Sequence, residues 1–545
     1  MATPGILYVT MEPRPRLSDQ QFHEWYNNEH GPTRLRLPHI FTNGFRYRAN
    51  DGQKPTYMAV YDVTAMSLLQ TPTYTSLRGS ASQHELATMA QVDVNRFFYD
   101  LIWEKKGANF VPIEQLTDNE AEGIELIATR FNLAGAEGDS KFAEWYSQEH
   151  VGLLSKVPGW LRTRLFKTST VDETGQTAYL AYNEFSKTNG LGGPEHQASI
   201  STPWARDVAE RYIISKERRT YSLFYIFGSA PRDTESLAKL ASSRDISAEG
   251  SSILRDDGLE QGTLFQFIKA PDGLCIPYKL EGNPDPKAPV VVFVNSLLTS
   301  MHMWNFLIPI LKEKRPHLRF LRYDARGRNK VPRREAATLS TLAADLHSLL
   351  AALRISKVNT LIGVSIGGAT ALKASIDYPD IIEKLVVCDI GCKSPANASQ
   401  MWQDRIAVAK DNDGEGIQRL ATQTVSRWFH PRNMQNEPLV TFMTEMVATN
   451  NVEGFTYSCT ALWDYDLGDQ LPLIQAPTLL VAGEEDGNGA VPKGMEAFKS
   501  KVTSQGAELK IIPGAGHLPM CETPQAFWQV IDGFLARDSC TQAVL

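Results

Sequence analysis

Short apolar runs alternate with helical patterns along the second half of the chain. Two of them, 263–270 and 274–281, flank the turn Pro271-Asp272-Gly273 and predict an opening hairpin. Between Ala396 and Leu467 the pattern is almost wholly helical, which predicts an inserted cap after the sixth strand. The other runs predict buried strands of a parallel sheet with helices on both faces: 289–295, 319–324, 358–364, 384–390, 477–483 and 508–513.

The first 230 residues contain an internal repeat. The segment Phe22–His30 returns 120 residues later as Phe142–His150, and Pro38 returns as Pro158. Around each copy the runs follow the order β-α-β-β-α-β, which is the ferredoxin-like order. In such a unit the helices cover only one face of the sheet, so we expect the uncovered faces of the two units to pack together. The strand-like runs are 5–10, 44–48, 57–63 and 96–103 in one copy and 123–129, 160–166, 178–185 and 220–227 in the other.

These patterns divide the chain into four parts, as its 545 residues exceed what a single hydrophobic core usually organises. The first two parts are the repeat units, 1–115 and 116–230. A polar, serine-containing stretch at 231–262 predicts a surface linker with one helix. The last part, 263–540, is the predicted sheet domain, with its helical cap at about 396–467.

Composition and charge narrow the class of protein. The hydrophobic fraction of 42% and the charged fraction of 21% are ordinary for a soluble protein, and a net charge of −7 gives no reason to expect nucleic-acid binding. No apolar run approaches membrane-spanning length and no secretory signal precedes the first strand, so we expect a cytoplasmic protein without a membrane partner. The six cysteines are irregularly spaced, which favours reduced thiols and no metal site, since Cys388 and Cys392 lack a second ligand pair. The oligomeric state stays open.

The chemistry of the second half is concentrated at the end of the run 358–364. Gly363-Val364-Ser365-Ile366-Gly367 is a Gly-x-Ser-x-Gly sequence between a strand and a helix, the nucleophile elbow of α/β-hydrolases. Such a turn is sharp, and the two glycines remove side chains that would clash. The serine hydroxyl then stands at the carboxyl end of the sheet, in front of a helix N-terminus that stabilises negative charge.

A serine nucleophile needs a base, and the base needs an orienting carboxylate. Asp486 follows the strand 477–483 and His517 follows the strand 508–513, so both are placed at the sheet edge that carries Ser365. Asp389, at the end of the preceding strand, is the rival acid, and Glu484 and Glu485 are weaker alternatives. We expect the two oxyanion donors to be the backbone N–H groups of Leu297 and Ile366.

The second half, from about 263 to 537, resembles the 3-oxoadipate enol-lactonase group of the α/β-hydrolases. The family usually follows Arg-Gly with a small-residue loop ending in serine, whereas this chain has Arg328-Asn329-Lys330-Val331-Pro332, which predicts a different pocket edge. The resemblance implies a hydrolase whose cap, including Trp428 and Arg405, shapes the acyl pocket. The motifs that carry it are Asn295–Leu297, His302–Trp304, Arg322–Gly327, Gly363–Gly368, Ser426–Phe429 and Ala461–Leu467.

The first half, about 5–228, resembles the EthD-type dimeric α/β-barrel family through its Glu-Trp-Tyr-x-x-Glu-His motif. In that family two chains usually form the barrel, whereas a tandem repeat could form it alone. The resemblance makes His30 and His150 acid–base candidates, since imidazole titrates near neutrality. The alternative is that both histidines only cap a helix or bond to a loop.

The combined prediction is an α/β-hydrolase preceded by a tandem, ferredoxin-like α/β barrel. Its predicted function is hydrolysis of a small-molecule lactone or related ester by a Ser365–His517–Asp486 acyl-enzyme mechanism, which requires no metal or organic cofactor. One alternative is a bifunctional isomerase or cyclase plus hydrolase in aromatic degradation or polyketide-type secondary metabolism. The other alternative is a hydrolase with a noncatalytic N-terminal binding or assembly module.

Overall fold

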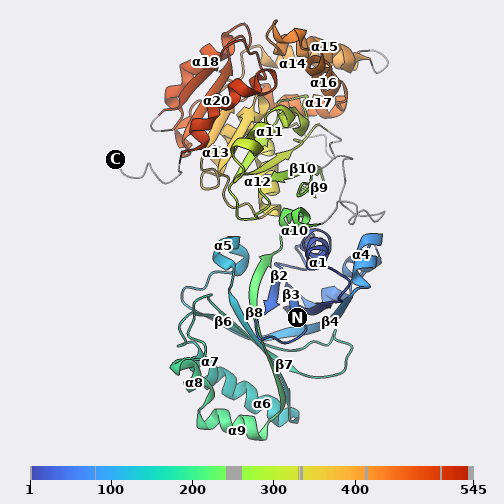
Figure 1. Ribbon diagram of the computed structural model, residues 1–545, viewed down its shortest axis with the longest axis vertical. Coiled ribbons are helices and arrows are strands. Elements are labelled where there is room, and N and C mark those ends of the chain that lie inside the picture. Colours follow the sequence, from blue (N-terminus) through green and yellow to red (C-terminus); the bar gives the residue numbers. More distant parts are fainter. Residues whose placement is uncertain are drawn as a thin grey trace. The chain divides into compact units, whose positions relative to one another are not determined.

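The computed structural model describes residues 3–79, 81–240, 260–328, 331, 336–411, 415–503 and 506–537. The chain divides into two compact units, 1–252 and 253–545 (Figure 1). Most of the predicted linker, 241–259, and the end of the predicted sheet domain, 538–540, lie outside the described residues. Within the described part of the chain, no helix is both long enough and apolar enough to cross a membrane.

In the N-terminal unit, eight strands of the described chain close into an antiparallel barrel. The order around the barrel is β1-β3-β2-β8-β5-β7-β6-β4, so the first four strands and the last four strands have the same internal order. The pairs β2–β8 and β4–β6 join the two halves. The strands are β1 (Gly5–Pro13), β2 (Phe45–Ala49), β3 (Tyr57–Val63), β4 (Val92–Lys106), β5 (Glu125–Leu133), β6 (Trp160–Thr168), β7 (Tyr179–Phe185) and β8 (Ile213–Ile226).

Two of these strands are much longer than their sequence pattern predicts. The expected runs 96–103 and 220–227 become β4, at 92–106, and β8, at 213–226. The first half of β8 contains the polar run 215–219, most of which is exposed, so it carries no alternation from which a strand could be predicted. Each long strand pairs with its own half and with the other half, and this pairing extends the strands.

The helices of the N-terminal unit lie outside the barrel, and the repeated motif has the same unusual backbone in both copies (Figure 1). Tyr26–His30 and Tyr146–His150 each form a π-helical turn directly after an α-helix, a feature often found at functional sites. The main helices are α1 (Asp19–Trp25), α3 (Pro72–Gly79), α4 (Gln83–Met89), α6 (Gly135–Trp145), α8 (Pro194–Ile200) and α9 (Pro203–Arg211).

The lumen of the barrel holds a hydrophobic core to which all eight strands contribute. Tyr182 Oη donates a hydrogen bond to Tyr47 Oη at 3.2 Å, which links the two halves across the lumen. Inward-facing members of the core include Ile6, Tyr8, Phe45, Met58, Val60, Tyr99, Leu126, Phe166, Leu180 and Tyr221. The lumen is therefore filled with side chains over much of its length.

The beginning of the predicted surface linker is packed against the barrel unit. Arg232, only 3% exposed, binds Asp118 at 2.6 Å and donates to the Ile226 carbonyl at 2.7 Å. Asp233 accepts a hydrogen bond from Asn27 at 2.6 Å before α10 (Thr234–Lys239) begins. Polar composition suggested exposure, but these polar groups find buried partners that are distant in sequence.

The C-terminal unit is an eight-stranded sheet of order β16-β15-β14-β13-β11-β12-β10-β9 in the described residues. All neighbouring pairs from β16 to β12 are parallel, and the hairpin β9–β10 adds an antiparallel edge. The strands are β9 (Leu264–Lys269), β10 (Cys275–Gly282), β11 (Val290–Val294), β12 (Arg319–Tyr323), β13 (Thr360–Val364), β14 (Leu385–Cys388), β15 (Thr478–Gly483) and β16 (Glu508–Ile512).

Helices cover this sheet, and four more gather at one end of the unit, in orange in Figure 1. The covering helices are α11 (Ile308–Lys314), α12 (Leu339–Ala352), α13 (Ile366–Asp377), α18 (Ala490–Phe498) and α20 (Pro524–Leu535). The four gathered helices form the predicted cap after β14: α14 (Ala398–Lys410), α15 (Gly416–Trp428), α16 (Glu437–Ala448) and α17 (Val452–Ser458).

The closed barrel predicts different behaviour for one half and for the whole. Fragment 1–240 should be a soluble monomer, whereas 1–115 should dimerise or aggregate, because it would expose one face of the lumen core. Each large apolar side chain in that core is worth roughly 1.5–3 kcal/mol when buried. Light scattering on both fragments tests this, and an obligate dimer of 1–240 would contradict it.

Candidate active site

The strained turn between β13 and α13 places Ser365. Its backbone lies at φ +57°, a region that L-residues rarely adopt, and α13 begins at the next residue. The turn is also tight: a Cβ on Gly363 would lie 2.2 Å from the Gly367 carbonyl oxygen. A Cβ on Gly367 would lie 2.2 Å from the Val294 carbonyl oxygen. Both glycines are therefore required by close backbone approach.

The loops after β15 and β16 bring an acid and a histidine together. His517 Nδ1 lies 2.8 Å from Asp486 Oδ2. Because a carboxylate only accepts hydrogen bonds, Nδ1 carries the proton and Nε2 is left as the basic nitrogen. The ring of His517 stacks on Trp428 of the cap, with centroids 5.8 Å apart. Its backbone N–H donates to the Trp428 carbonyl at 2.6 Å.

Ser365, Asp486 and His517 all line one pocket of about 470 Å³. The cap contributes a large part of its wall, including Trp402, Arg405 and Trp428. A volume of this size suits a small organic substrate. The structure thus brings the three predicted catalytic residues to one cavity under the cap.

Asp389 lines the same pocket but does not contact the histidine. Its backbone has φ +51°, its Oδ1 accepts the Gly483 N–H at 2.8 Å, and its carboxyl group is hydrogen-bonded to that of Asp486. Burial, and then the charge of Asp486, raise the pKa of Asp389 well above its usual value. This shift favours the protonated form of Asp389, whereas Asp486 is the carboxyl group that binds His517. Glu484 and Glu485 are exposed and do not line the pocket.

Of the two predicted oxyanion donors, Ile366 directly follows the nucleophile, and Leu297 lines the same pocket as Ser365. In the described structure, neither the Leu297 N–H nor the Ile366 N–H donates to another residue. The loop that carries Leu297 is held from several directions. The Asn295 side chain accepts a hydrogen bond from the Trp304 indole N–H and donates one to the Tyr323 carbonyl, both at 2.8 Å. Two amide donors in a fixed loop are what an oxyanion site requires.

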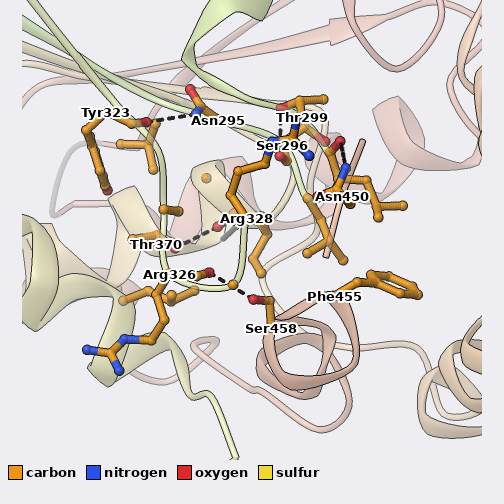
Figure 2. A pocket seen from close by; sticks show the side chains of 18 residues that line it. Asn295, Ser296, Thr299, Tyr323, Arg326, Arg328, Thr370, Asn450, Phe455 and Ser458 are labelled. Atoms are coloured by element: carbon orange, nitrogen blue, oxygen red, sulfur yellow. Dashed lines mark hydrogen bonds between the residues drawn. The ribbon is translucent and has the colours of Figure 1, made fainter. Parts of the chain in front are cut away.

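A second, much smaller cavity of about 30 Å³ is lined in part by residues 295–299 of this loop (Figure 2). Asn450 of the cap side donates to the Leu298 carbonyl at 2.7 Å, and Ser458 donates to the Arg326 carbonyl at 2.8 Å. Arg328, the first residue of the segment that departs from the family pattern, lines this cavity and not the larger pocket. Asn329, Lys330 and Pro332 lie outside the described residues.

One positioning residue was missed by the sequence analysis. Glu522 is 8% exposed, and its carboxylate accepts the Gly516 N–H at 2.9 Å. It also accepts the His430 N–H and the Asn433 amide, each at 2.8 Å. This carboxylate therefore joins the His517 loop to the end of the cap. No sequence motif marked it, because two of its three donors, His430 and Asn433, lie about 90 residues away.

Three cationic side chains line the pocket: Lys393, Arg405 and Arg427. Among the described residues, none of them forms an ion pair. Burial, and then the neighbouring Arg427, lower the pKa of Arg405 to about 10, so the guanidinium remains charged at neutral pH. Its carbon lies 4.4 Å from the Trp402 ring centroid. The pocket can thus supply positive charge to a ligand.

His30 and His150, the candidates of the N-terminal unit, are buried and already bonded. His30 Nδ1 lies 2.6 Å from Glu85 Oε1, and His150 Nδ1 donates to the Ser199 carbonyl at 3.0 Å. Burial lowers the pKa of each histidine to about 4. Neither lines a cavity that the structure describes. The described residues also contain no group of three His, Cys, Asp or Glu side chains arranged for a metal ion.

Comparison with known proteins agrees with the C-terminal fold. Residues 289–524 match the family model described as alpha/beta hydrolase fold. The chain is 30% identical over 256 residues to 3-oxoadipate enol-lactonase 1 of Acinetobacter baylyi, covering 46% of this chain and 91% of that protein. It is 28% identical over 266 residues to 3-oxoadipate enol-lactonase 2 of the same organism, covering 48% and 94%. The solved enol-lactonase of Burkholderia xenovorans is 26% identical, covers 50% of this chain and all of its own, and gives a TM-score of 0.45.

The two neighbouring acids should respond differently to the same substitution. Asp486→Asn should lower kcat by about 10,000-fold, because an amide imposes the wrong histidine tautomer. Asp389→Asn changes a side chain that forms no hydrogen bond to His517 into an amide of similar shape, and kcat should fall by less than about tenfold. Steady-state hydrolysis of a chromogenic ester compares the two variants, and the reverse ranking would assign the acid role to Asp389.

Proposed function

The C-terminal half of this chain belongs to the α/β-hydrolase family, and we propose that it hydrolyses a lactone or related ester through Ser365, His517 and Asp486. The observation that carries the proposal is the 2.8 Å contact between His517 and Asp486 in the pocket that Ser365 also lines. This arrangement supplies a nucleophile, a base and an orienting acid at one edge of the sheet.

In the proposed reaction, His517 Nε2 takes the proton of Ser365 as Oγ attacks the carbonyl carbon. The negative oxygen that forms is stabilised by the N–H groups of Leu297 and Ile366 and by the N-terminus of α13. His517 then protonates the departing oxygen, which opens a lactone ring or releases an alcohol. Water activated by His517 attacks the acyl-enzyme and frees Ser365. Asp486 holds the histidine tautomer throughout.

The substrate class follows from the charge of the pocket. Lys393, Arg405 and Arg427 line it without an ionic partner among the described residues. A substrate with a free carboxylate would provide that partner, and guanidinium groups bind carboxylates with two parallel hydrogen bonds. The relatives named above are 3-oxoadipate enol-lactonases, and we propose an acidic lactone or ester here as well.

For the N-terminal half, we propose a tandem EthD-type barrel that serves as a noncatalytic binding or assembly module. The buried, bonded His30 and His150 support this role, because their lowered pKa values and absence from the described cavities give no route for acid–base chemistry. The largely filled lumen supports it too. Detection of isomerase or cyclase activity that depends on either histidine would favour the bifunctional alternative.

Substitution of the nucleophile tests the mechanism. Ser365→Ala should lower ester or lactone hydrolysis by several powers of ten and abolish labelling by a fluorophosphonate, because the reactive oxygen is removed. Ser426→Ala removes an exposed serine of the same cap and should leave both readouts unchanged. Near-normal turnover by Ser365→Ala would refute the serine mechanism.

Removal of the cap cations tests the substrate class. Arg405→Gln and Arg427→Gln should each raise KM for a carboxylate-bearing ester by about tenfold or more, the size expected for a hydrogen bond to a charged group. The matching uncharged ester should change little. Arg419→Gln is the control, because Arg419 is an exposed cap arginine already paired with Asp411 at 3.1 Å. Equal effects on both esters would contradict an acidic substrate.

A further inference from the structure

One part of the barrel lumen is not filled. A cavity of about 300 Å³ lies among inward-facing side chains of β1, β4, β5, β7 and β8. Its wall combines the rings of Tyr8, Phe97, Tyr99 and Tyr221 with the guanidinium groups of Arg130 and Arg219. It lies wholly within the N-terminal unit and shares no residue with the hydrolase pocket.

The tyrosines of this cavity act as neutral donors. Burial raises the pKa of Tyr99 to about 12 and also raises the pKa values of Tyr8 and Tyr221. Tyr221 is fully buried, and its hydroxyl accepts a hydrogen bond from the Tyr8 hydroxyl. The proton of the Tyr221 hydroxyl can still be donated to a ligand with an acceptor oxygen.

The two arginines differ in what they already bind. Arg219 is satisfied, since it donates to Asp51 at 2.9 Å and to the carbonyls of Gln53 and Pro55. Arg130 forms no ion pair within the described structure, and its Nε is buried without a partner. Glu217 faces Arg130 in the β5–β8 register but is exposed and does not pair with it. The cavity therefore holds a cation, Arg130, that forms no ion pair among the described residues, although Glu217 also lines its wall.

The apolar surface beside Arg130 is aromatic. The guanidinium carbon lies 5.1 Å from the Phe97 ring centroid, and Phe97 and Tyr99 stack at 6.3 Å with an interplanar angle of 25°. Flat aromatic walls favour a flat ring as ligand. A volume of about 300 Å³ is at the small end of ligand pockets and suits a single ring.

We propose that this barrel cavity is a second ligand site that binds a monocyclic aromatic carboxylate. The carboxylate lies against Arg130 and accepts a hydrogen bond from the Tyr221 hydroxyl, and the ring packs against Phe97 and Tyr99. Glu217, at the exposed side of the cavity, repels a second negative charge on the ligand, so the site favours monoacids over diacids. The site is independent of the chemistry at Ser365.

Isothermal titration of the full-length protein tests the site with three probes. Benzoate should bind with one-to-one stoichiometry. Benzamide, which lacks the charge, and cyclohexanecarboxylate, which lacks the aromatic ring, should each bind at least about tenfold more weakly. No benzoate binding up to about 10 mM, or equal binding of all three probes, would overturn the proposal.

Matched variants locate the bound benzoate. Arg130→Gln should weaken it at least about tenfold and Tyr221→Phe severalfold, whereas Glu217→Gln should not weaken it. Arg130→Lys keeps the charge and should give an intermediate affinity, so the test survives if Arg130→Gln does not fold. Ester hydrolysis by the Arg130 variants should equal that of the wild type. Benzoate binding that is lost in Arg405→Gln but retained in Arg130→Gln would place the probe in the hydrolase pocket and refute the barrel site.

Discussion

The close approach of three backbone segments at the start of α13 is the constraint on which the hydrolase site depends. Gly363 and Gly367 leave no room for a Cβ against the Gly367 and Val294 carbonyl groups, so the elbow packs directly on the strand that leads into the oxyanion loop. This contact sets the position of the Ser365 hydroxyl relative to the Leu297 and Ile366 amides. Because these groups belong to rigid elements, they need no reorganisation when charge develops.

The rest of the site is built on the carboxyl edge of the parallel sheet. Asp389, Asp486 and His517 each follow a neighbouring strand, so two carboxyl groups reach the same cavity. Their roles are separated by environment: burial raises the pKa of Asp389, while Asp486 contacts His517. Neighbouring titratable groups whose environments differ in this way often take different roles in acid and base chemistry. Glu522 adds a further buried carboxyl that fixes the histidine loop.

The barrel closes because two repeated halves pair with each other, and the halves differ in some of their side-chain contacts. Both copies keep the π-helical turn and a tilted contact between the histidine and tryptophan rings. The histidine partner differs, however: a carboxylate for His30 and a backbone carbonyl for His150. The two halves also differ inside the lumen. A strictly symmetric barrel would contain two equivalent cavities, whereas the described lumen has one, in which Arg130 forms no ion pair.

The sequence by itself determined the features that depend on neighbours along the chain. These are the alternation of apolar runs and helices, the Gly-x-Ser-x-Gly turn, the positions of Asp486 and His517 after their strands, and the repeat. The hydrolase fold predicted from them is confirmed by the family match. What only the tertiary structure decided depends on segments far apart in sequence. The choice between Asp389 and Asp486, the lengths of β4 and β8, the packing of 230–240, the unpaired cap cations and the barrel cavity all arise from such contacts. The local sequence pattern does not predict which distant groups come into contact, because burial and hydrogen-bond partners are determined only when the strands pair and the loops pack.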